Sequence, residues 1–349
     1  MWRKQGFQKG VFVMAGLLVF LVVGYFSPAM SAEPFVVSIW GGHWKEVIEK
    51  AASDPFVQKT GQKVEYDVGE TTDRLARTRA TKGSPQADIA FTTSHVARLY
   101  ASEGLLEPID VKKLSYAKNV VKEAFRSPTA IAIYATVYTI GYRTDMIKRP
   151  ITSWEDLWSP ELKGKVILPA FDPSHIIVMS ALLSGGNEFN WEKGWEKLKA
   201  LKDNVVAFYA TGLQSIEMMR RGEAAVGVMN SPNIFRLEQE GVPVKLVIPK
   251  EKAIVTMDVV TILKGTKNID AAHKYIDILL SPEAQAKIAI GFNGTPMNPQ
   301  APLPKEVVER PGIFTKPEQW ATQAYIMDEA QRANMLDVWK ERFRRDIMR

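Results

Sequence analysis

The chain has 349 residues, of which 46% are apolar and 24% are charged, so it is too rich in core-forming residues to be disordered and long enough for about two domains. Its formal net charge of +6 is small for this length and no arginine-rich run occurs, which excludes a nucleic-acid binder. The absence of cysteine excludes disulfides, thiolate catalysis, cysteine-based zinc sites and a lipid anchor attached through a cysteine.

The N-terminus has the layout of a secretory signal peptide over residues 1–32. A basic head with Arg3, Lys4 and Lys9 precedes an apolar stretch over 11–26 that is short for a membrane span, and small residues at 29–32 suit cleavage. Removal of this segment leaves 42 basic against 39 acidic side chains, close to neutrality. We therefore expect a soluble exported protein that folds without disulfides, as in a bacterial periplasm.

From residue 35 onward, short apolar runs alternate with helical patterns. Strands are predicted at 35–40, 64–68, 88–91, 166–168, 205–209, 225–229 and 244–248, with helices between them and a long amphipathic helical segment from about residue 317. This rhythm predicts an α/β fold with a mostly parallel sheet. No linker rich in Gly or Ser separates two domains, so we expect the chain to cross between them within strands, at 133–142 and 255–263.

Five loops follow a predicted strand and open a predicted helix, at 41–44, 92–95, 171–175, 210–212 and 230–233. Ligands of open α/β sheets bind beyond the carboxyl ends of the strands, and helix N-termini there present unpaired N–H groups. The same loops also suit ordinary helix caps, with Asp172 before Pro173 and Ser231 before Pro232 as N-cap candidates.

Asp258 interrupts an apolar strand, and a buried charge needs a partner or access to water. It either binds a cationic group of a ligand across a cleft, or is an internal carboxylate held by a salt bridge or by hydrogen bonds at the hinge. Among the tryptophans, Trp40 at a strand end is the candidate for stacking on a ligand, whereas Trp44 fits a helical apolar stripe and is assigned to the core.

Three of the four histidines, His43, His95 and His175, lie in the first three strand-end loops. Imidazole can ligate a metal, donate to an anion or stack as a ring. None of these residues shares a ligand spacing with another, so simple hydrogen bonding is favoured and a metal-ion receptor using the three is the alternative.

Signature motifs of catalysis are absent from the sequence: it contains no Gly-x-Ser-x-Gly elbow, Walker loop, His-Glu-x-x-His or Gly-x-Gly-x-x-Gly after a strand. We therefore expect a protein that is not an enzyme and needs no cofactor. A secreted enzyme on the same scaffold is the other alternative, since paired carboxylates form in space and leave no spacing in the sequence.

Several stretches together resemble the periplasmic solute-binding proteins of ABC importers, and within them the spermidine/putrescine-binding branch. These stretches are Ser-Ile-Trp-Gly-Gly at 38–42, Ala-Asp-Ile-Ala at 87–90, Glu-Gly-Leu-Leu-Glu-Pro-Ile-Asp at 103–110, Thr-Ser-Trp-Glu-Asp-Leu-Trp at 152–158, Leu-Lys-Gly-Lys-Val at 162–166, Met-Asp at 257–258 and Gly-Thr-Pro at 294–296. The resemblance implies a type II periplasmic binding protein, with two α/β lobes and a ligand cleft at the hinge. Lobe 1 would comprise residues 33–136 and 257–305, lobe 2 residues 137–256, and a C-terminal helical segment, 306–349, would pack on the lobes.

The same resemblance implies a set of ligand-binding residues: Trp40 as an aromatic wall, Asp172 and Asp258 as carboxylates, and Thr93 as a polar neighbour of the ligand. The chain departs from the branch at His43 and His95, which replace phenols, at His175, which replaces a carboxylate, at Met229 and Thr256, which replace tryptophans, and at Phe292, which replaces a tyrosine. With the loop residues, the predicted ligand-binding set is Trp40, His43, Thr93, Ser94, His95, Asp172, His175, Asn230, Asp258 and Phe292.

Half of the aromatic lining is missing, which disfavours a long polyamine, while carboxylates together with imidazoles suit a small zwitterion. We therefore expect a monomer that captures a small polar amine-bearing solute, either a polyamine or an amino-acid-like zwitterion. By resemblance, it closes at the hinge and delivers the solute to a membrane ABC permease.

Overall fold

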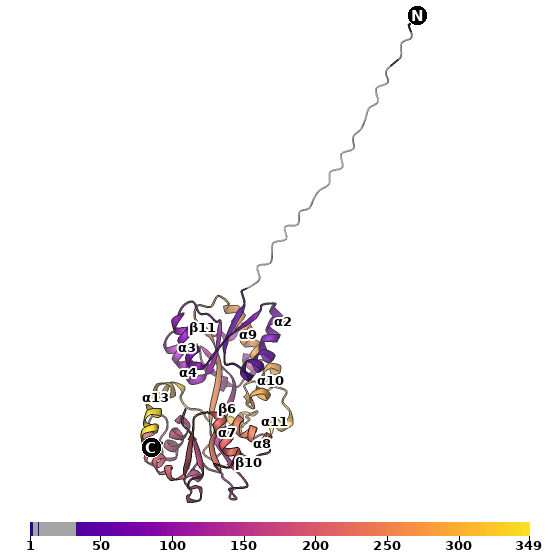
Figure 1. Ribbon diagram of the computed structural model, residues 1–349. Helices are drawn as coiled ribbons and strands as arrows, with labels where there is room; N and C mark the ends of the chain where they lie inside the picture. The colour runs from indigo at the N-terminus through magenta and orange to yellow at the C-terminus, as the bar shows by residue number, and fades with distance from the viewer. Residues whose placement is uncertain (3–5, 7–32) are drawn as a thin grey trace. The chain divides into compact units, whose positions relative to one another are not determined.

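Two long antiparallel strands, β6 (Ala130–Arg143) and β11 (Ala253–Leu263), run through the centre of the sheet and join its two halves (Figure 1). They coincide with the two crossing strands expected from the sequence. The structure is a computed structural model that describes residues 1–2, 6 and 33–349. The predicted signal peptide lies almost entirely outside the described residues.

All strands of residues 33–349 belong to one sheet, whose central path runs β2-β1-β3-β11-β6-β9-β7-β8. The outer strands on this path pair in parallel, as the β/α alternation predicts, but the pairings of β6 and most of those of β11 are antiparallel, so the expectation of a mostly parallel sheet is wrong. Their bounds are β1 Phe35–Ile39, β2 Val64–Val68, β3 Ile89–Thr93, β7 Val166–Pro169, β8 Val205–Tyr209 and β9 Val226–Asn230. Shorter strands off the path are β4 Leu106–Glu107, β5 Phe125–Ser127, β10 Val244–Val247, β12 Thr295–Pro296 and β13 Ala324–Tyr325.

Helices flank both halves of the sheet. In the half that contains β1 to β3, which we call lobe 1, they are α1 His43–Ile48, α2 Asp54–Thr60, α3 Thr71–Ala80, α4 Ser94–Ser102, α9 Ile269–Leu279 and α10 Pro282–Phe292. In the half that contains β7 to β10, which we call lobe 2, they are α5 Ser174–Leu183, α6 Trp195–Ala200, α7 Gly212–Arg220 and α8 Ser231–Gln239. The chain ends in α11 Lys305–Val308, α12 Pro317–Gln323 and α13 Glu329–Asp346.

Each lobe has its own hydrophobic core, and β6 passes from one to the other. Residues of β6 up to Val137 pack in the core of lobe 1, whereas Tyr138, Ile140 and Tyr142 pack in the core of lobe 2. This crossing within a strand agrees with the expectation drawn from the missing linker. The exact lobe boundaries stay a prediction.

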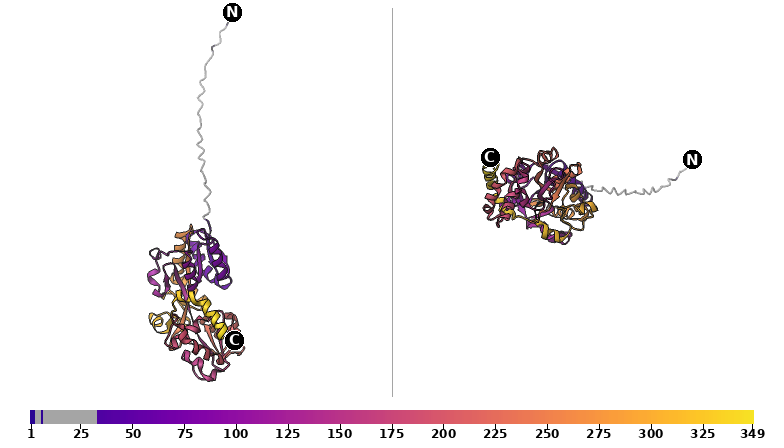
Figure 2. Two further views of the ribbon diagram at one scale, coloured as in Figure 1. Left: turned by 90° about the vertical axis from the view of Figure 1, so that its left-hand side faces the viewer. Right: turned by 90° about the horizontal axis from the view of Figure 1, so that it is seen from below.

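The C-terminal segment from residue 317 is helical, as the amphipathic pattern predicts, but it consists of two helices. It is broken by β13, which pairs in parallel with the start of β11 and so brings the chain back to the junction between the lobes. From there α13 extends along lobe 2, where Trp339, Phe343 and Ile347 are buried in the core (Figure 2). The break has a tertiary cause, strand pairing with β11, that a local pattern does not contain.

Both N-cap candidates of the strand-end loops are wrong, whereas two other serines do cap helical segments. Ser153 forms a capping box at the turn over Trp154–Trp158, and Ser281 accepts from the N–H of Ala284 at the start of α10. Asn230, rather than Ser231, precedes α8, and the Ser231 hydroxyl instead accepts from the backbone N–H of Val137. Pro173 precedes α5, although the Asp172 carboxylate still accepts from the N–H of Ser174 one residue further on.

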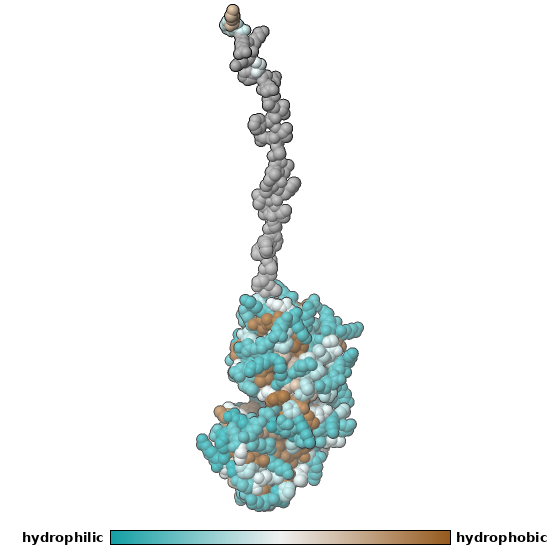
Figure 3. All heavy atoms as spheres, turned by 90° about the vertical axis from the view of Figure 1, so that its right-hand side faces the viewer, coloured by the Kyte–Doolittle hydropathy of each residue, from teal (hydrophilic) through white to brown (hydrophobic). Residues whose placement is uncertain are grey.

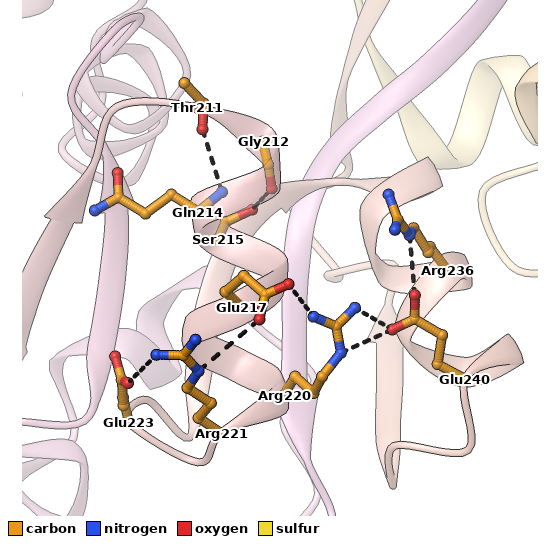
Figure 4. Close-up of polar contacts among 10 residues, drawn as sticks. All are labelled: Thr211, Gly212, Gln214, Ser215, Glu217, Arg220, Arg221, Glu223, Arg236 and Glu240. Atoms are coloured by element: carbon orange, nitrogen blue, oxygen red, sulfur yellow. Dashed lines mark hydrogen bonds and ion pairs between the residues drawn. The ribbon is translucent and has the colours of Figure 1, made fainter. Parts of the chain in front are cut away.

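Two helices of lobe 2, α7 and α8, are fastened to each other by an ion-pair cluster at their C-terminal ends (Figure 4). Arg220 pairs with Glu217 of its own helix and with Glu240 beyond α8, and Arg236 pairs with the same Glu240. At the opposite end of α7, Thr211 caps the helix by accepting from the N–H of Gln214. The cluster therefore holds in place two helices whose other ends face the junction between the lobes.

The surface of residues 33–349 is mostly hydrophilic on the face drawn in Figure 3, with small hydrophobic patches over both lobes and between them. Among the described residues, none of the helices combines the length and apolar composition that a membrane span requires.

Candidate functional site

A cavity of about 840 Å³ opens where the two lobes meet, within the size range of small-molecule sites. Each of the five strand-end loops contributes to its lining, although the sequence could not show that they converge. The predicted site residues that line it are Trp40, Thr93, His95, Asp172, His175, Asn230 and Asp258.

Asp258 lies in the part of the cavity formed by the crossing strands. The pairing of β11 with β6 shifts register between Asp258 and Val259, and such a bulge re-aims side chains. Tyr134 is the direct cross-strand partner of Asp258 in β6, and its hydroxyl donates to the Asp258 carboxylate at 2.5 Å. On the other side of β11, Asp258 is paired with Thr93 of β3. Burial raises the pKa of Asp258 to about 6, against the lowering effect of the Tyr134 hydrogen bond.

An aromatic wall stands beside this carboxylate. Trp40 and Trp44 both line the cavity, with ring centroids 4.6 Å apart. The Trp40 indole donates to the Thr71 hydroxyl at 2.9 Å, and the guanidinium of buried Arg74 lies 4.7 Å from its ring centroid. These contacts fix the orientation of the Trp40 ring. The assignment of Trp44 wholly to the core is wrong. Its side chain packs against the hydrophobic core of lobe 1 and also borders the cavity.

Asp172, the second predicted carboxylate, already has a cationic partner. Arg332 of α13 donates to it at 2.6 Å, and both side chains are buried. Burial by itself would raise the pKa of Asp172, but Arg332 lowers it overall, so this carboxylate is ionised at neutral pH. The Ser174 hydroxyl also donates to Asp172 at 2.6 Å.

The two histidines of the cavity are neutral. Burial lowers the pKa of both His95 and His175 to about 3, and nearby Arg332 adds to the lowering. The His175 ring stacks on Tyr138 with centroids 3.8 Å apart, and Arg332 approaches its Nε2 at 3.4 Å. Because arginine only donates, we assign Nε2 as the acceptor, which places the proton of His175 on Nδ1.

Several buried polar atoms of the lining have no hydrogen-bond partner among the described residues. They are Thr93 Oγ1, His95 Nδ1, His175 Nδ1, Asn230 Oδ1 and Arg332 Nε. Most buried polar groups in folded proteins are hydrogen-bonded. Unpartnered donors and acceptors on one cavity therefore indicate a surface built to bind a polar molecule.

Three predicted site residues lie outside this lining. His43 donates through Nε2 to the Gly291 carbonyl at 2.7 Å, and the Ser94 hydroxyl donates to Glu329 at 2.6 Å. Phe292 stacks behind Trp44, with centroids 4.4 Å apart, and so supports the aromatic wall from the rear.

The alternative of a metal site using three histidines finds no support in this arrangement. His43 is engaged with backbone, and within residues 33–349 no group of three or more His, Asp or Glu side chains gathers in a way that could hold a metal ion.

Arg332 is the functional candidate that sequence reasoning missed. It lies on a charged amphipathic helix, where arginine normally faces water, and its partner Asp172 is 160 positions away in the chain. Tyr134, the partner of Asp258, lies inside a continuous apolar run. In neither case does a local pattern point to the cavity.

A polar cleft between two α/β lobes, joined by strands that cross between them, defines a ligand-binding protein of the type II periplasmic class. The chain belongs to the bacterial extracellular solute-binding protein family, whose sequence profile matches residues 51–315.

Relatives of known name agree with this assignment. A spermidine/putrescine-binding periplasmic protein of Haemophilus influenzae is 27% identical over 287 residues, covering 78% of this chain and 79% of the relative. The corresponding protein of Escherichia coli is 28% identical over 265 residues, covering 72% and 75%. A crystal structure of an ABC transporter protein from Clostridium perfringens superposes with a TM-score of 0.81 at 25% identity, covering 90% of this chain and 99% of the other.

These findings confirm the predicted family, the fold class and the role as the substrate-binding component of an ABC transporter. They also confirm the predicted periplasmic location.

Proposed function

We propose that this protein captures a small polar amine-bearing solute, a polyamine or an amino-acid-like zwitterion, and delivers it to a membrane ABC permease. The observation that carries the proposal is Asp258, a carboxylate of the cavity lining that pairs with no cation among the described residues. An ammonium group placed there would gain both the charge of Asp258 and the π face of Trp40. The polyamine-binding relatives point to the same class of ligand.

Capture proceeds by closure of the lobes about β6 and β11. Thr93 and His95 come from lobe 1, whereas Asp172, His175 and Asn230 come from lobe 2. A ligand that contacts both sets binds the closed arrangement better, and so shifts the population toward it. The permease would then recognise the two lobe surfaces in their closed relation. In this role the protein acts as a monomer and releases its ligand chemically unchanged.

The test begins with the solute that the protein carries when purified. Mass spectrometry of the small molecules released on denaturation is expected to find an amine-bearing compound in stoichiometric amount, without a reaction product. The refolded, ligand-free protein is then titrated calorimetrically with putrescine, spermidine, amino acids, dicarboxylates and salts of zinc and iron. Binding of an amine-bearing compound supports the proposal, and binding of metal salts alone overturns it.

Two variants distinguish a loss of binding at the ammonium site from a general effect of substitution on the protein. Asp258→Asn removes the charge but keeps the shape of the side chain, and is expected to abolish amine binding. Asp270→Asn on α9 is the matched control, because Asp270 is exposed and forms only a surface ion pair with Lys113. Equal loss of binding in both variants would contradict the assignment of the ammonium site to Asp258.

A further inference from the structure

The C-terminal helix α13 brings one basic side chain into the ligand cleft. Arg332 is only 4% exposed and lines the same cavity as Asp172 and Asp258. The helix is fixed at this end in several ways. Asp328 caps it by accepting from the N–H of Gln331, the backbone N–H of Asp328 donates to buried Glu188, and Glu329 accepts from Ser94 of lobe 1.

Arg332 uses only part of its hydrogen-bonding capacity within the chain. One terminal nitrogen donates to Asp172 at 2.6 Å and approaches His175 at 3.4 Å, while the other lies 4.0 Å from Glu329. Its Nε has no partner among the described residues, and neither has Nδ1 of His175. With the tautomer assigned above, both of these atoms are donors that an acceptor group of a ligand can satisfy.

The charges of the lining are therefore unequal at its two ends. At one end Arg332 pairs with Asp172 and also lies 4.0 Å from Glu329, and the neutral His95 and His175 add no charge. Beside the crossing strands, Asp258 accepts from the Tyr134 hydroxyl and forms no ion pair with any of the described residues. A second ammonium group of a diamine would thus meet the guanidinium of Arg332 and two unpartnered donors, where a carboxylate would find a cation and hydrogen bonds.

We propose that Arg332 makes this receptor selective for solutes with one ammonium group and an anionic or acceptor end, that is, amino-acid-like zwitterions, and excludes di- and polyamines. The inference rests on the proposed function and names the ligand class of the same site. In it, Asp258 holds the ammonium, while Arg332 holds Asp172 and donates to the ligand carboxylate. The guanidinium of Arg332 occupies the position beside Asp172 that a second ammonium group of the ligand would need.

The test compares ligands that differ only in their second end group. Calorimetry of the refolded full-length mature protein is run with ω-amino acids, α,ω-diamines and monoamines of equal chain length, and with α-amino acids. For the wild type, the best zwitterion is expected to bind at least about tenfold more tightly than the diamine of the same length, a difference of about 1.4 kcal/mol.

Substitution of Arg332 is expected to reverse this order. In Arg332→Gln the zwitterion loses its cation and Asp172 becomes free for an ammonium, so the ratio of the two affinities should shift by about a hundredfold or more toward the diamine. Arg332→Lys keeps the charge and should keep the zwitterion preference. Arg344→Gln, an exposed arginine on the same helix, is the matched control and should behave as the wild type.

Loss of the Arg332 charge leaves Asp172 buried without a cation, so circular dichroism and urea unfolding accompany each titration. If Arg332→Gln does not fold, the double variant Arg332→Gln/Asp172→Asn removes both charges and should lose the zwitterion preference without gaining diamine affinity. A wild-type protein that binds diamines more tightly than zwitterions, with an order that Arg332→Gln leaves unchanged, overturns this inference and leaves the proposed function standing. Absence of binding by any amine-bearing compound overturns both.

Discussion

Replacement of Asp258 by asparagine should stabilise the ligand-free protein while it abolishes binding. The pKa of Asp258 rises from 3.8 to about 6 because burial disfavours the charged form. A carboxyl group whose pKa is higher in the folded state binds its proton more tightly there, so stability is lost as the pH rises from 3.8 through about 6. At about 1.4 kcal/mol for each pKa unit, the ionised Asp258 lowers the free energy of unfolding by about 3 kcal/mol at neutral pH.

Asparagine keeps an oxygen that can accept from the Tyr134 hydroxyl, so Asp258→Asn should remove this penalty without creating a cavity. Urea unfolding of the two ligand-free proteins measures it: we expect the variant to be more stable by about 3 kcal/mol at pH 7.5, and the difference to vanish as the pH falls below 3.8, where the wild-type carboxyl becomes protonated in both states. Asp270→Asn again serves as the control. A variant that is less stable than the wild type at pH 7.5, or a difference that does not depend on pH, would refute the reasoning.

Three further outcomes follow from the geometry. The affinity for an amine should fall by about tenfold for each pH unit below about 6, because the proton competes with the ammonium for Asp258, and calorimetry over a pH series measures this. Gly194→Ala should prevent stable folding, since a Cβ there would overlap the backbone of Ser180 and Ala181 in α5; urea unfolding checks it, and a loss below about 1 kcal/mol would contradict it. Trp40→Leu should weaken amine binding by about tenfold, from the loss of a cation–π contact, with little change in the circular dichroism spectrum.

The sequence predicted the scaffold well because its signals are local. The continuous apolar runs of β6 and β11 identified the two strands that cross between the lobes, and alternating patterns with helix caps located the elements around them. The five loops could be named for the same reason, since each is a strand end followed by a helix start. Asp258 was identifiable as a lone charge in an apolar strand.

The composition of the site could not be predicted in the same way, because it depends on contacts between distant segments. The apolar helical stripe that contains Trp44 has the same sequence pattern whether it faces a core or borders a cavity. His43 and Ser94 lie in loops that reach the cleft, yet their side chains are engaged by Gly291 and Glu329. The position of α13 depends on the pairing of β13 with β11, which no periodicity within the C-terminal segment encodes.

The ion pair between Asp172 and Arg332 also bears on how the protein, if it binds amines as proposed, remains stable before it binds its ligand. Two buried carboxylates without cations would each lower the stability of the empty protein, as Asp258 does by about 3 kcal/mol. Arg332 reverses this effect at Asp172, whose pKa it brings below the ordinary value, so of these two carboxylates Asp258 alone is without a cation among the described residues. The free energy released when a ligand ammonium pairs with Asp258 is then available for lobe closure. A receptor that kept both carboxylates free would need a second ligand cation to recover the same stability, and the position of Arg332 makes that cation unnecessary.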